Sequence, residues 1–181
     1  MSPMAYFAKQ TILETERLCL RPLQLNDLED YHEYVSDDEL LRYDFPASRN
    51  LEESLEALVA YNLAQPLGRY ALEVKENQKM IGHFSLRLNP EQTCVEIGYV
   101  IHRQYNGKGY GSEALRALIS FLQTIPQLEK IIATIERPNI ASQRLVEKQG
   151  FIHVETLKNV QSLRNEKTMK YVYVFMLHKV T

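Results

Sequence analysis

Three glycines alternate at positions 107, 109 and 111, directly after an apolar, strand-like run and directly before an amphipathic helical pattern. Glycine lets the backbone adopt conformations that other residues avoid, and lets it approach a ligand without an intervening Cβ. Successive N–H groups in such a turn point into one concavity at the positive end of the helix dipole. The spacing predicts a phosphate-binding turn. A plain tight turn that starts a helix is the alternative.

Two common nucleotide motifs do not fit this turn. A P-loop needs a lysine followed by serine or threonine at the helix start, whereas Gly111 is followed by Ser112 and Glu113. A dinucleotide fingerprint would place its third glycine at position 112 and would open a parallel sheet. The phosphate ligand is therefore expected to be of another kind.

The elements that position the turn follow from the periodicity of apolar residues, which predicts a mixed α/β chain. We expect a single domain over residues 1–181, with a loose segment over about residues 1–10. Helices are expected from about residue 28, at 51–62, at 109–124 and at 139–149. Strands are expected at 15–22, 69–74, 80–88, 93–101, 130–136, 151–156 and 170–177.

Four stretches of the chain resemble the GNAT superfamily of N-acetyltransferases, and within it the ribosomal-protein N-terminal (Rim-type) branch. The resemblance covers about residues 15–179 and implies a mixed α/β fold. Its sheet is central, strongly twisted, mostly antiparallel and seven-stranded, with a V-shaped splay between the fourth and fifth strands and about four helices. The stretches are Thr15-Glu-Arg-Leu18 with Arg21-Pro22, Ile81-Gly82, Glu96-Ile-Gly-Tyr99 leading to Gly107-Lys-Gly-Tyr-Gly-Ser-Glu-Ala114, and Asn139-Ile-Ala-Ser142 leading to Glu147-Lys-Gln-Gly-Phe151.

The resemblance implies acetyl-coenzyme A as cosubstrate. Backbone amides in the turn would hold its pyrophosphate, the splayed strand would pair with its pantetheine arm, and the helix after Asn139 would lie near the thioester. Asn106 stands where the superfamily often has Arg or Gln. This difference is expected to change the affinity for the coenzyme without abolishing binding, because the backbone amides make most of the contacts with the pyrophosphate. The expected cofactor-binding residues are Tyr99, Val100, Ile101, Asn106, Gly107, Lys108, Gly109, Tyr110, Gly111, Ser112 and Asn139.

Acetyl transfer to an amine needs a neutral nucleophile, so a base is expected. Glu96 is the candidate, directly or through water, because it sits in an otherwise apolar strand on the face shared with Gly98 and Val100. An ion pair with a cross-strand arginine or lysine is the alternative role. His102, at the end of the strand, is the alternative base.

The departing thiolate takes a proton, and the developing oxyanion needs a donor. The backbone N–H of Val100 or Ile101 is the expected donor. Many relatives place a tyrosine where this chain has Val146, so Ser142 is the expected acid. Ser142 could instead only cap its helix, and the thiolate could leave unassisted because a thiol pKa is about 8.5.

The resemblance implies an acceptor site near the first helical region, where Tyr31 or Tyr43 is expected to line the substrate cleft. The acidic run at 36–39 either attracts a cationic amine or is a solvated helix end. The expected function is N-acetylation of a primary amine, in particular a protein or peptide N-terminal amine. A small-molecule acceptor (polyamine or aminoglycoside-like) and a non-catalytic acyl-coenzyme A sensor are the alternatives.

Composition excludes several other classes. The net charge is −2 and the basic residues are scattered, so a nucleic-acid partner is not expected. No apolar stretch approaches the roughly 20 residues of a membrane helix, and no cysteine–histidine spacing predicts a metal site. The two cysteines, Cys19 and Cys94, are expected as free thiols in a reducing, cytoplasmic setting. The apolar run 171–177 indicates a central strand or an interface, which leaves a homodimer as an alternative.

Overall fold

The structure, a computed structural model, describes residues 1–177. Its centre is one sheet of eight strands in the order β1-β2-β3-β4-β5-β6-β8-β7. All neighbouring pairs are antiparallel except β5 and β6. The predicted mixed α/β class and mostly antiparallel sheet are confirmed. The strands are β1 (Leu13–Glu14), β2 (Leu18–Arg21), β3 (Arg69–Val74), β4 (Met80–Leu88), β5 (Cys94–Ile101), β6 (Lys130–Glu136), β7 (Ile152–Gln161) and β8 (Lys167–Met176).

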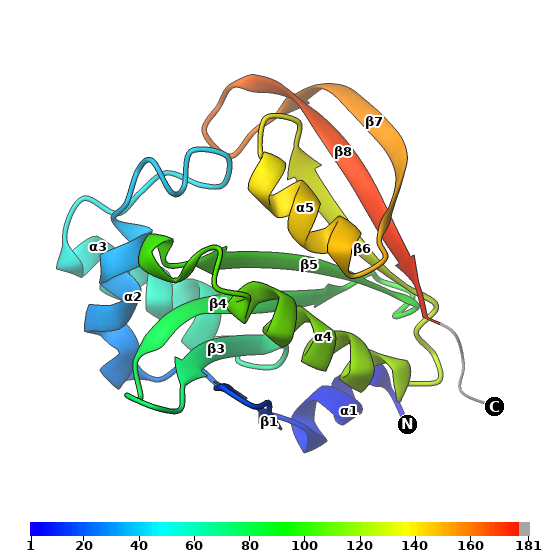
Figure 1. Cartoon of the computed structure of the whole chain (residues 1–181), viewed down its shortest axis with the longest axis horizontal. Coiled ribbons are helices and arrows are strands. Elements are labelled where there is room, and N and C mark those ends of the chain that lie inside the picture. Colours follow the sequence, from blue (N-terminus) through cyan, green and yellow to red (C-terminus); the bar gives the residue numbers. More distant parts are fainter. Residues whose placement is uncertain (178–181) are drawn as a thin grey trace.

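β5 and β6 are neighbours for only part of their length. Residues 94–96 of β5 pair with residues 130–132 of β6, and the ladder goes no further although both strands continue. Figure 1 shows the two strands diverging, with β6, β7 and β8 on one side of the opening and β1 to β5 on the other. The predicted splay lies between the strands expected at 93–101 and 130–136, which are β5 and β6, and it is confirmed. The β6-facing edge of β5 beyond Glu96 is therefore without a ladder partner.

Helices cover both faces of the sheet. One cluster of buried apolar side chains joins the sheet to α1, α4 and α5, and a second joins it to α2 and α3. Figure 1 shows α4 along the β5 side of the opening and α5 along the β6 side. The helices are α1 (Pro3–Lys9), α2 (Leu28–Val35), α3 (Leu51–Leu58), α4 (Tyr110–Gln123) and α5 (Ile140–Lys148), with shorter helical turns η1 (Leu25–Asp27), η2 (Val59–Leu63) and η3 (Arg103–Tyr105).

The helix that follows the glycine turn is held by its apolar stripe. Leu115, Leu118, Ile119 and Leu122 recur at helical spacing and are all buried against the sheet. Burying a leucine-sized side chain contributes about 1.5–3 kcal/mol. The N-terminus of α4 is thus fixed relative to the end of β5, which is what a preformed turn between them requires.

The N-terminal segment differs from the prediction. Residues 1–10 were expected to be loose, but most of them form α1. Ser2 caps this helix by accepting a hydrogen bond from the amide of Ala5 at 3.3 Å. Phe7 is 1% exposed and packs 5.9 Å from the ring of Phe121. The prediction of a loose segment was wrong because a seven-residue helix shows little periodicity. The buried residues Pro3 and Phe7 hold it against the rest of the protein.

The structure contains two elements that the sequence did not predict, the strand β1 and the helix α1. The two-residue strand β1, paired with β2, makes the sheet eight-stranded instead of seven-stranded, and α1 brings the α-helices of residues 1–177 to five. The apolar run in β8 was predicted to be a central or an interface strand. β8 lies between β6 and β7, and this interior position accounts for the run without a partner chain.

The last residues of the resemblance, 178 and 179, lie outside the described residues. Within residues 1–177, none of the helices combines the length and the apolar character needed to cross a bilayer.

Candidate active site

The glycine turn connects the end of β5 to α4. Gly107 and Gly109 have φ of +76° and +86°, a left-handed region that residues with a Cβ rarely adopt. Gly109 is the N-cap of α4 and offers no side chain to the helix amides. Glycine is therefore needed at positions 107 and 109 for the backbone conformation of the turn, in agreement with the prediction from their spacing.

The amides of this turn are without internal partners. Among the described residues, the backbone N–H groups of residues 107–112 donate to no acceptor; the first helical hydrogen bond runs from the amide of Glu113 to the carbonyl of Gly109 at 3.0 Å. Unpaired amides at a helix N-terminus are a favourable environment for an anion. The turn can therefore hold a phosphate-type group, and in this respect the residues fit the pyrophosphate of a coenzyme.

Gly111 has a different role from its two neighbours. A Cβ built on it would lie 2.7 Å from Cδ1 of Ile101 and 3.3 Å from a methyl carbon of Leu145. The first of these distances is shorter than real Cβ contacts. Gly111 therefore allows α4 to pack closely against the end of β5 and the side of α5, which brings the three walls of the site together.

An ion pair between Arg17, just before β2, and Glu113, in the first turn of α4, holds the glycine turn in place. Glu113 accepts hydrogen bonds from Thr15 Oγ1 at 2.6 Å, from the Arg17 amide at 2.8 Å and from Arg17 Nε at 2.7 Å. Arg17 Nη1 also donates to the carbonyl oxygen of Lys108 at 3.0 Å. Burial acts to raise the pKa of Glu113, but the hydrogen bonds from Thr15 and Arg17 outweigh it and the pKa is lowered. Sequence reasoning quoted these residues as a motif without assigning them this role.

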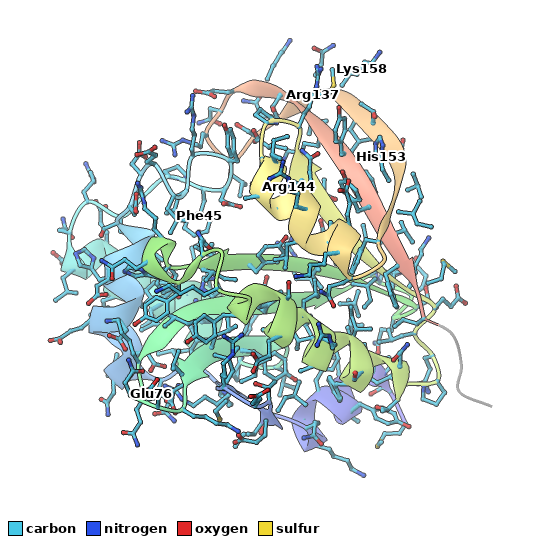
Figure 2. The ribbon with its side chains drawn as sticks, viewed as in Figure 1. Phe45, Glu76, Arg137, Arg144, His153 and Lys158 are labelled. Carbon is cyan, nitrogen blue, oxygen red and sulfur yellow. The ribbon has the colours of Figure 1, made fainter. Side chains whose placement is uncertain are left out.

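A cavity of about 640 Å³ lies where these walls meet. Its lining comes from the loop between α2 and α3, the end of β5, the glycine turn and α5. Figure 2 shows Arg144 on α5 and Phe45, the neighbour of Asp44, on that loop. The lining residues are Glu39, Leu40, Tyr43, Asp44, Tyr99, Val100, Ile101, Arg103, Tyr105, Asn106, Gly107, Gly109, Tyr110, Gly111, Ser112, Asn139, Ala141, Ser142, Arg144, Leu145 and Lys148.

The cavity brings together nearly all of the residues expected to bind the cofactor. Lys108 is the exception, because its carbonyl faces Arg17 and its Nζ lies 5.4 Å from the centre of the Tyr105 ring. Besides Arg103, sequence reasoning missed two cationic residues of the lining, Arg144 and Lys148. Their i, i+4 spacing after the helix cap at Asn139 was the available signal, since it places both on one face of α5.

A hydroxyl pair spans the opening between β5 and α5. Tyr99 Oη lies 2.6 Å from Ser142 Oγ, and it also donates to the Ser142 carbonyl oxygen at 3.3 Å. Burial raises the pKa of Tyr99, so the phenol keeps its proton at neutral pH. The side chain of Asn139 accepts from the Ser142 amide at 3.2 Å, which confirms Asn139 as the cap of α5.

The two residues considered as bases lie outside the lining. Glu96 Oε2 is 3.3 Å from Nη2 of Arg87, its cross-strand neighbour on β4, so the alternative ion-pair role is present in the structure. His102 Nδ1 accepts from the Gln104 amide at 3.2 Å, and its Nε2 lies 3.4 Å from the Glu33 carboxylate. Both ring nitrogens of His102 are therefore engaged.

The two tyrosines expected at the acceptor site separate in the structure. Tyr43 lines the cavity. Tyr31 is 2% exposed and packs edge-to-face on Tyr34, with ring centres 5.4 Å apart, so its expected substrate contact is wrong. The prediction followed from the place of the first helical region in the family, whereas in this structure Tyr31 points into the core beneath α2.

The acidic run at residues 36–39 is engaged in ion pairs. Arg103 donates to Asp37 and to Glu39, and Arg164 donates to Asp38 at 2.6 Å. The run therefore fastens the α2–α3 loop to the glycine turn and to the β7–β8 connection. No cluster of metal-ligating side chains occurs within residues 1–177, and both cysteines are free and half-buried.

Comparisons with known proteins agree with this geometry. A family model described as an acetyltransferase (GNAT) domain matches residues 17–152. The uncharacterized N-acetyltransferase YnaD of Bacillus subtilis (strain 168) is 29% identical over 164 residues, which cover 91% of this chain and 96% of that protein. The uncharacterized N-acetyltransferase p20 of Bacillus licheniformis is 30% identical over 172 residues, covering 92% and 96%.

Solved structures show the same architecture. An acetyltransferase (GNAT family) from Bacillus anthracis has a TM-score of 0.83 and 27% identity, covering 91% of this chain and 98% of that one. Two neighbours under 25% identity show the fold alone. They are a ribosomal L7/L12 alpha-N-protein acetyltransferase in complex with coenzyme A (TM-score 0.80, 18% identity, 92% and 98% covered) and a spermidine N-acetyltransferase from Vibrio cholerae in complex with coenzyme A and spermine (TM-score 0.76, 21% identity, 91% and 98% covered). Because the family model spans the splayed strand, the glycine turn and the capped helix, this chain belongs to the GNAT family of N-acetyltransferases.

Proposed function

We propose that this protein transfers an acetyl group from acetyl-coenzyme A to a primary amine, and that its acceptor is the N-terminal amine of a protein or peptide. The observation that carries the proposal is the set of unpaired amides at residues 107–112, which open into the same cavity as the splayed edge of β5 and the Ser142 hydroxyl. The thioester of the coenzyme supplies the activated acetyl group. The protein supplies binding, orientation and proton transfer.

Coenzyme binding is assigned to three parts of the cavity. The amides of residues 107–112 hold the pyrophosphate at the N-terminus of α4. Arg144 and Lys148 line the same cavity and add positive charge for the phosphates. The free edge of β5 at residues 99–101 offers backbone groups to the pantetheine amides, and Asn139 lies across from it on the lining.

Oxyanion stabilisation and thiolate protonation are assigned to β5 and α5. The backbone N–H of Ile101 stabilises the oxyanion. The amide of His102 donates to a carbonyl on β4, so the amide of Val100, two residues earlier, also faces β4 and that of Ile101 faces the open edge. A preorganised donor of this kind contributes on the order of 2.7–4 kcal/mol. Ser142 donates its hydroxyl proton to the thiolate. Tyr99 acts as a positioning residue, because its phenol at 2.6 Å fixes the orientation of the Ser142 hydroxyl.

The role of Glu96 as base stays a prediction from the sequence. Its carboxylate pairs with Arg87 and its side chain is 42% exposed, outside the cavity lining. No proton is therefore routed through Glu96 in this proposal.

The part of the cavity that is lined by the α2–α3 loop favours an acceptor amine with a single positive charge. Two carboxylates line the cavity, those of Glu39 and Asp44, and Glu39 is paired with Arg103 at 3.2 Å. One carboxylate without an ion pair matches one ammonium group. A polyamine, which carries several, is the second candidate because one structural neighbour is a spermidine N-acetyltransferase.

The test measures thiol release from acetyl-coenzyme A with a panel of acceptors. The panel contains short peptides with different first residues, the same peptides with blocked N-termini, and spermidine and other small amines. We expect turnover with peptides that have a free N-terminus and none with the blocked peptides. Turnover on polyamines alone would refute the protein acceptor, and tight coenzyme binding without turnover on any amine would indicate a sensor.

A further inference from the structure

Asp44 lines the cavity, and no chemical step described so far involves it. It lies on the loop between α2 and α3, where its amide donates to the Leu41 carbonyl at 2.9 Å. Its neighbour Tyr43 lines the same cavity, as does Tyr99 of β5. The loop therefore presents Asp44 to the same cavity that the glycine turn lines.

The carboxylate of Asp44 has no hydrogen-bond or ion-pair partner among the described residues. No side-chain oxygen in residues 1–177 is both fully buried and without a partner. Because Asp44 is half-buried and lines the cavity, its oxygens must reach the cavity. An incoming donor can meet them without displacing a protein group.

The other carboxylates of this loop are already engaged. Asp37 and Glu39 receive hydrogen bonds from Arg103, and Asp38 receives one from Arg164. These ion pairs hold the start of the loop, just after α2, against the rest of the protein. Asp44 differs from its neighbours in keeping its charge unneutralised next to a cavity.

The electrostatic surroundings of Asp44 are defined by three groups. Glu136, at the end of β6, repels a negative charge on Asp44, and Lys170, on β8, attracts it. Tyr99, which lines the same cavity, has its pKa raised by burial and in turn by the charge of Asp44. Burial and then the charge of Glu136 raise the pKa of Asp44 to about 7. A carboxylate in such a place gains from a bound cation.

We infer that Asp44 binds the ammonium group of the acceptor and takes its first proton, which makes it a catalytic residue of the proposed reaction. This inference rests on the proposed function. Its ligand class is a primary ammonium, held by the Asp44 carboxylate before the acetyl group is transferred.

The proton balance is complete with groups in the cavity. One ammonium proton passes to Asp44, which leaves a lone pair on the nitrogen. The C–N bond then forms and the C–S bond breaks, with the sulfur keeping the electron pair of that bond. The nitrogen loses a second proton, which replaces the one that the Ser142 hydroxyl gives to the thiolate. Asp44 returns its proton to solvent. The products are an amide, a thiol and one released proton.

Asp44 suits this role better than Glu96 on physical grounds. A general base works best when its pKa lies near the working pH. Asp44 meets this condition and lines the cavity, whereas Glu96 is held in an ion pair outside it.

The first test compares Asp44→Asn with Asp38→Asn in acetylation of a free-amine peptide. Both variants remove one negative charge from the same loop, but Asp38 is 70% exposed in its side chain and lies outside the cavity lining. We expect Asp44→Asn to lower kcat/KM by about 100-fold with little change in coenzyme affinity. Asp38→Asn should stay within about twofold of the unmodified protein.

The pH profile gives a readout that a structural role would not produce. With Asp44 as base, kcat/KM rises with pH and levels off above about pH 7. In Asp44→Asn it should instead keep rising up to the pKa of the acceptor amine, because only the free amine reacts. Equal profiles for the two proteins, or a loss below about twofold, would overturn the inference.

A second measurement separates failure of this inference from failure of the proposed function. The carboxyl carbon of Asp44 is titrated by NMR, without coenzyme, in the presence and absence of the peptide or of spermidine. A bound ammonium should lower the pKa of Asp44. If no amine is acetylated but this shift occurs, the acceptor site stands and the proposed function fails. If amines are acetylated but none shifts Asp44, the inference fails alone.

Discussion

The hydroxyl oxygens of Tyr99 and Ser142 lie 2.6 Å apart and join the splayed strand β5 to helix α5. Each of these two elements contributes one hydroxyl to the contact. Burial raises the pKa of Tyr99, which keeps it protonated. The pair is therefore a fixed donor arrangement next to the proposed position of the thioester.

Ser142→Ala should lower kcat by about tenfold, while KM for acetyl-coenzyme A changes little. The effect is modest for an acid because a thiolate with a pKa of about 8.5 needs little help to leave. Tyr99→Phe should have a smaller effect, since Ser142 keeps its hydroxyl and loses only its orientation. Steady-state kinetics of both variants and of the double variant will test this. If the double variant lost the product of the two single effects, the hydroxyls would act independently.

Gly109→Ala should weaken coenzyme binding by tenfold or more. The left-handed backbone of Gly109 costs a residue with a Cβ about 1–2 kcal/mol, and relief of that strain would turn amides away from the cavity. Gly150→Ala is the matched control: its φ is +94° and its Cβ would make only ordinary contacts with Phe175, outside the cavity lining. Calorimetry should find similar losses of stability but a changed coenzyme Kd for Gly109→Ala alone. Unchanged affinity in both variants would count against the pyrophosphate site.

Glu113→Gln should destabilise the protein by about 1.5–3 kcal/mol, because its side chain is 17% exposed and accepts charge-assisted hydrogen bonds. It should also weaken coenzyme binding several-fold, since Arg17 then holds the Lys108 carbonyl less firmly. Thermal unfolding and calorimetric titration measure the two effects. The control Glu53→Gln removes the exposed pair with Arg49 on α3 and should change neither by a measurable amount. Equal effects of the two variants would refute the role of Glu113 in holding the turn.

Glu96→Gln should leave kcat/KM within about twofold and lower stability by less than about 1 kcal/mol, as is usual for an exposed ion pair. Arg87→Gln breaks the same pair from the other side and should match it. Acetylation rates and thermal unfolding of both variants make the comparison. A hundredfold loss in Glu96→Gln alone would restore Glu96 as the base and displace Asp44.

His83 should make the protein less stable in mild acid. Burial, and then the charge of Arg69, lower the pKa of His83 to about 4, against about 6.5 in an unfolded chain. Between these values the unfolded chain binds a proton that the folded chain does not. Stability is therefore fully retained above about pH 6.5 and falls as the pH drops toward 4, by up to about 3 kcal/mol.

Urea unfolding of His83→Gln and of the unmodified protein between pH 4 and pH 8 will test this dependence. The variant should lose much of the slope of stability against pH below 6.5. Tyr34→Phe removes only the 2.8 Å hydrogen bond to His83 Nδ1 and should keep the slope. A slope that is unchanged in His83→Gln would assign the acid sensitivity to other groups.

Local features of the sequence predicted the glycine turn, the helix after it and the cap at Asn139. Each of these depends on residues within one or two turns of the chain: a φ that glycine permits, an apolar stripe that recurs every three or four residues, a side chain that reaches its own helix. The same motifs occur along the chain in the order found in the GNAT family. The mostly antiparallel sheet and its splay were predicted from this resemblance.

Tertiary structure alone decided which distant side chains share the site. Arg17 meets Glu113 across 96 positions, and Tyr99 meets Ser142 across 43. Asp44 became a candidate only when the loop carrying it was seen to line the cavity, and Tyr31 ceased to be one when it was found in the core. Sequence spacing cannot report these contacts, because the direction of a side chain depends on how its element packs and on which neighbours already neutralise its charge.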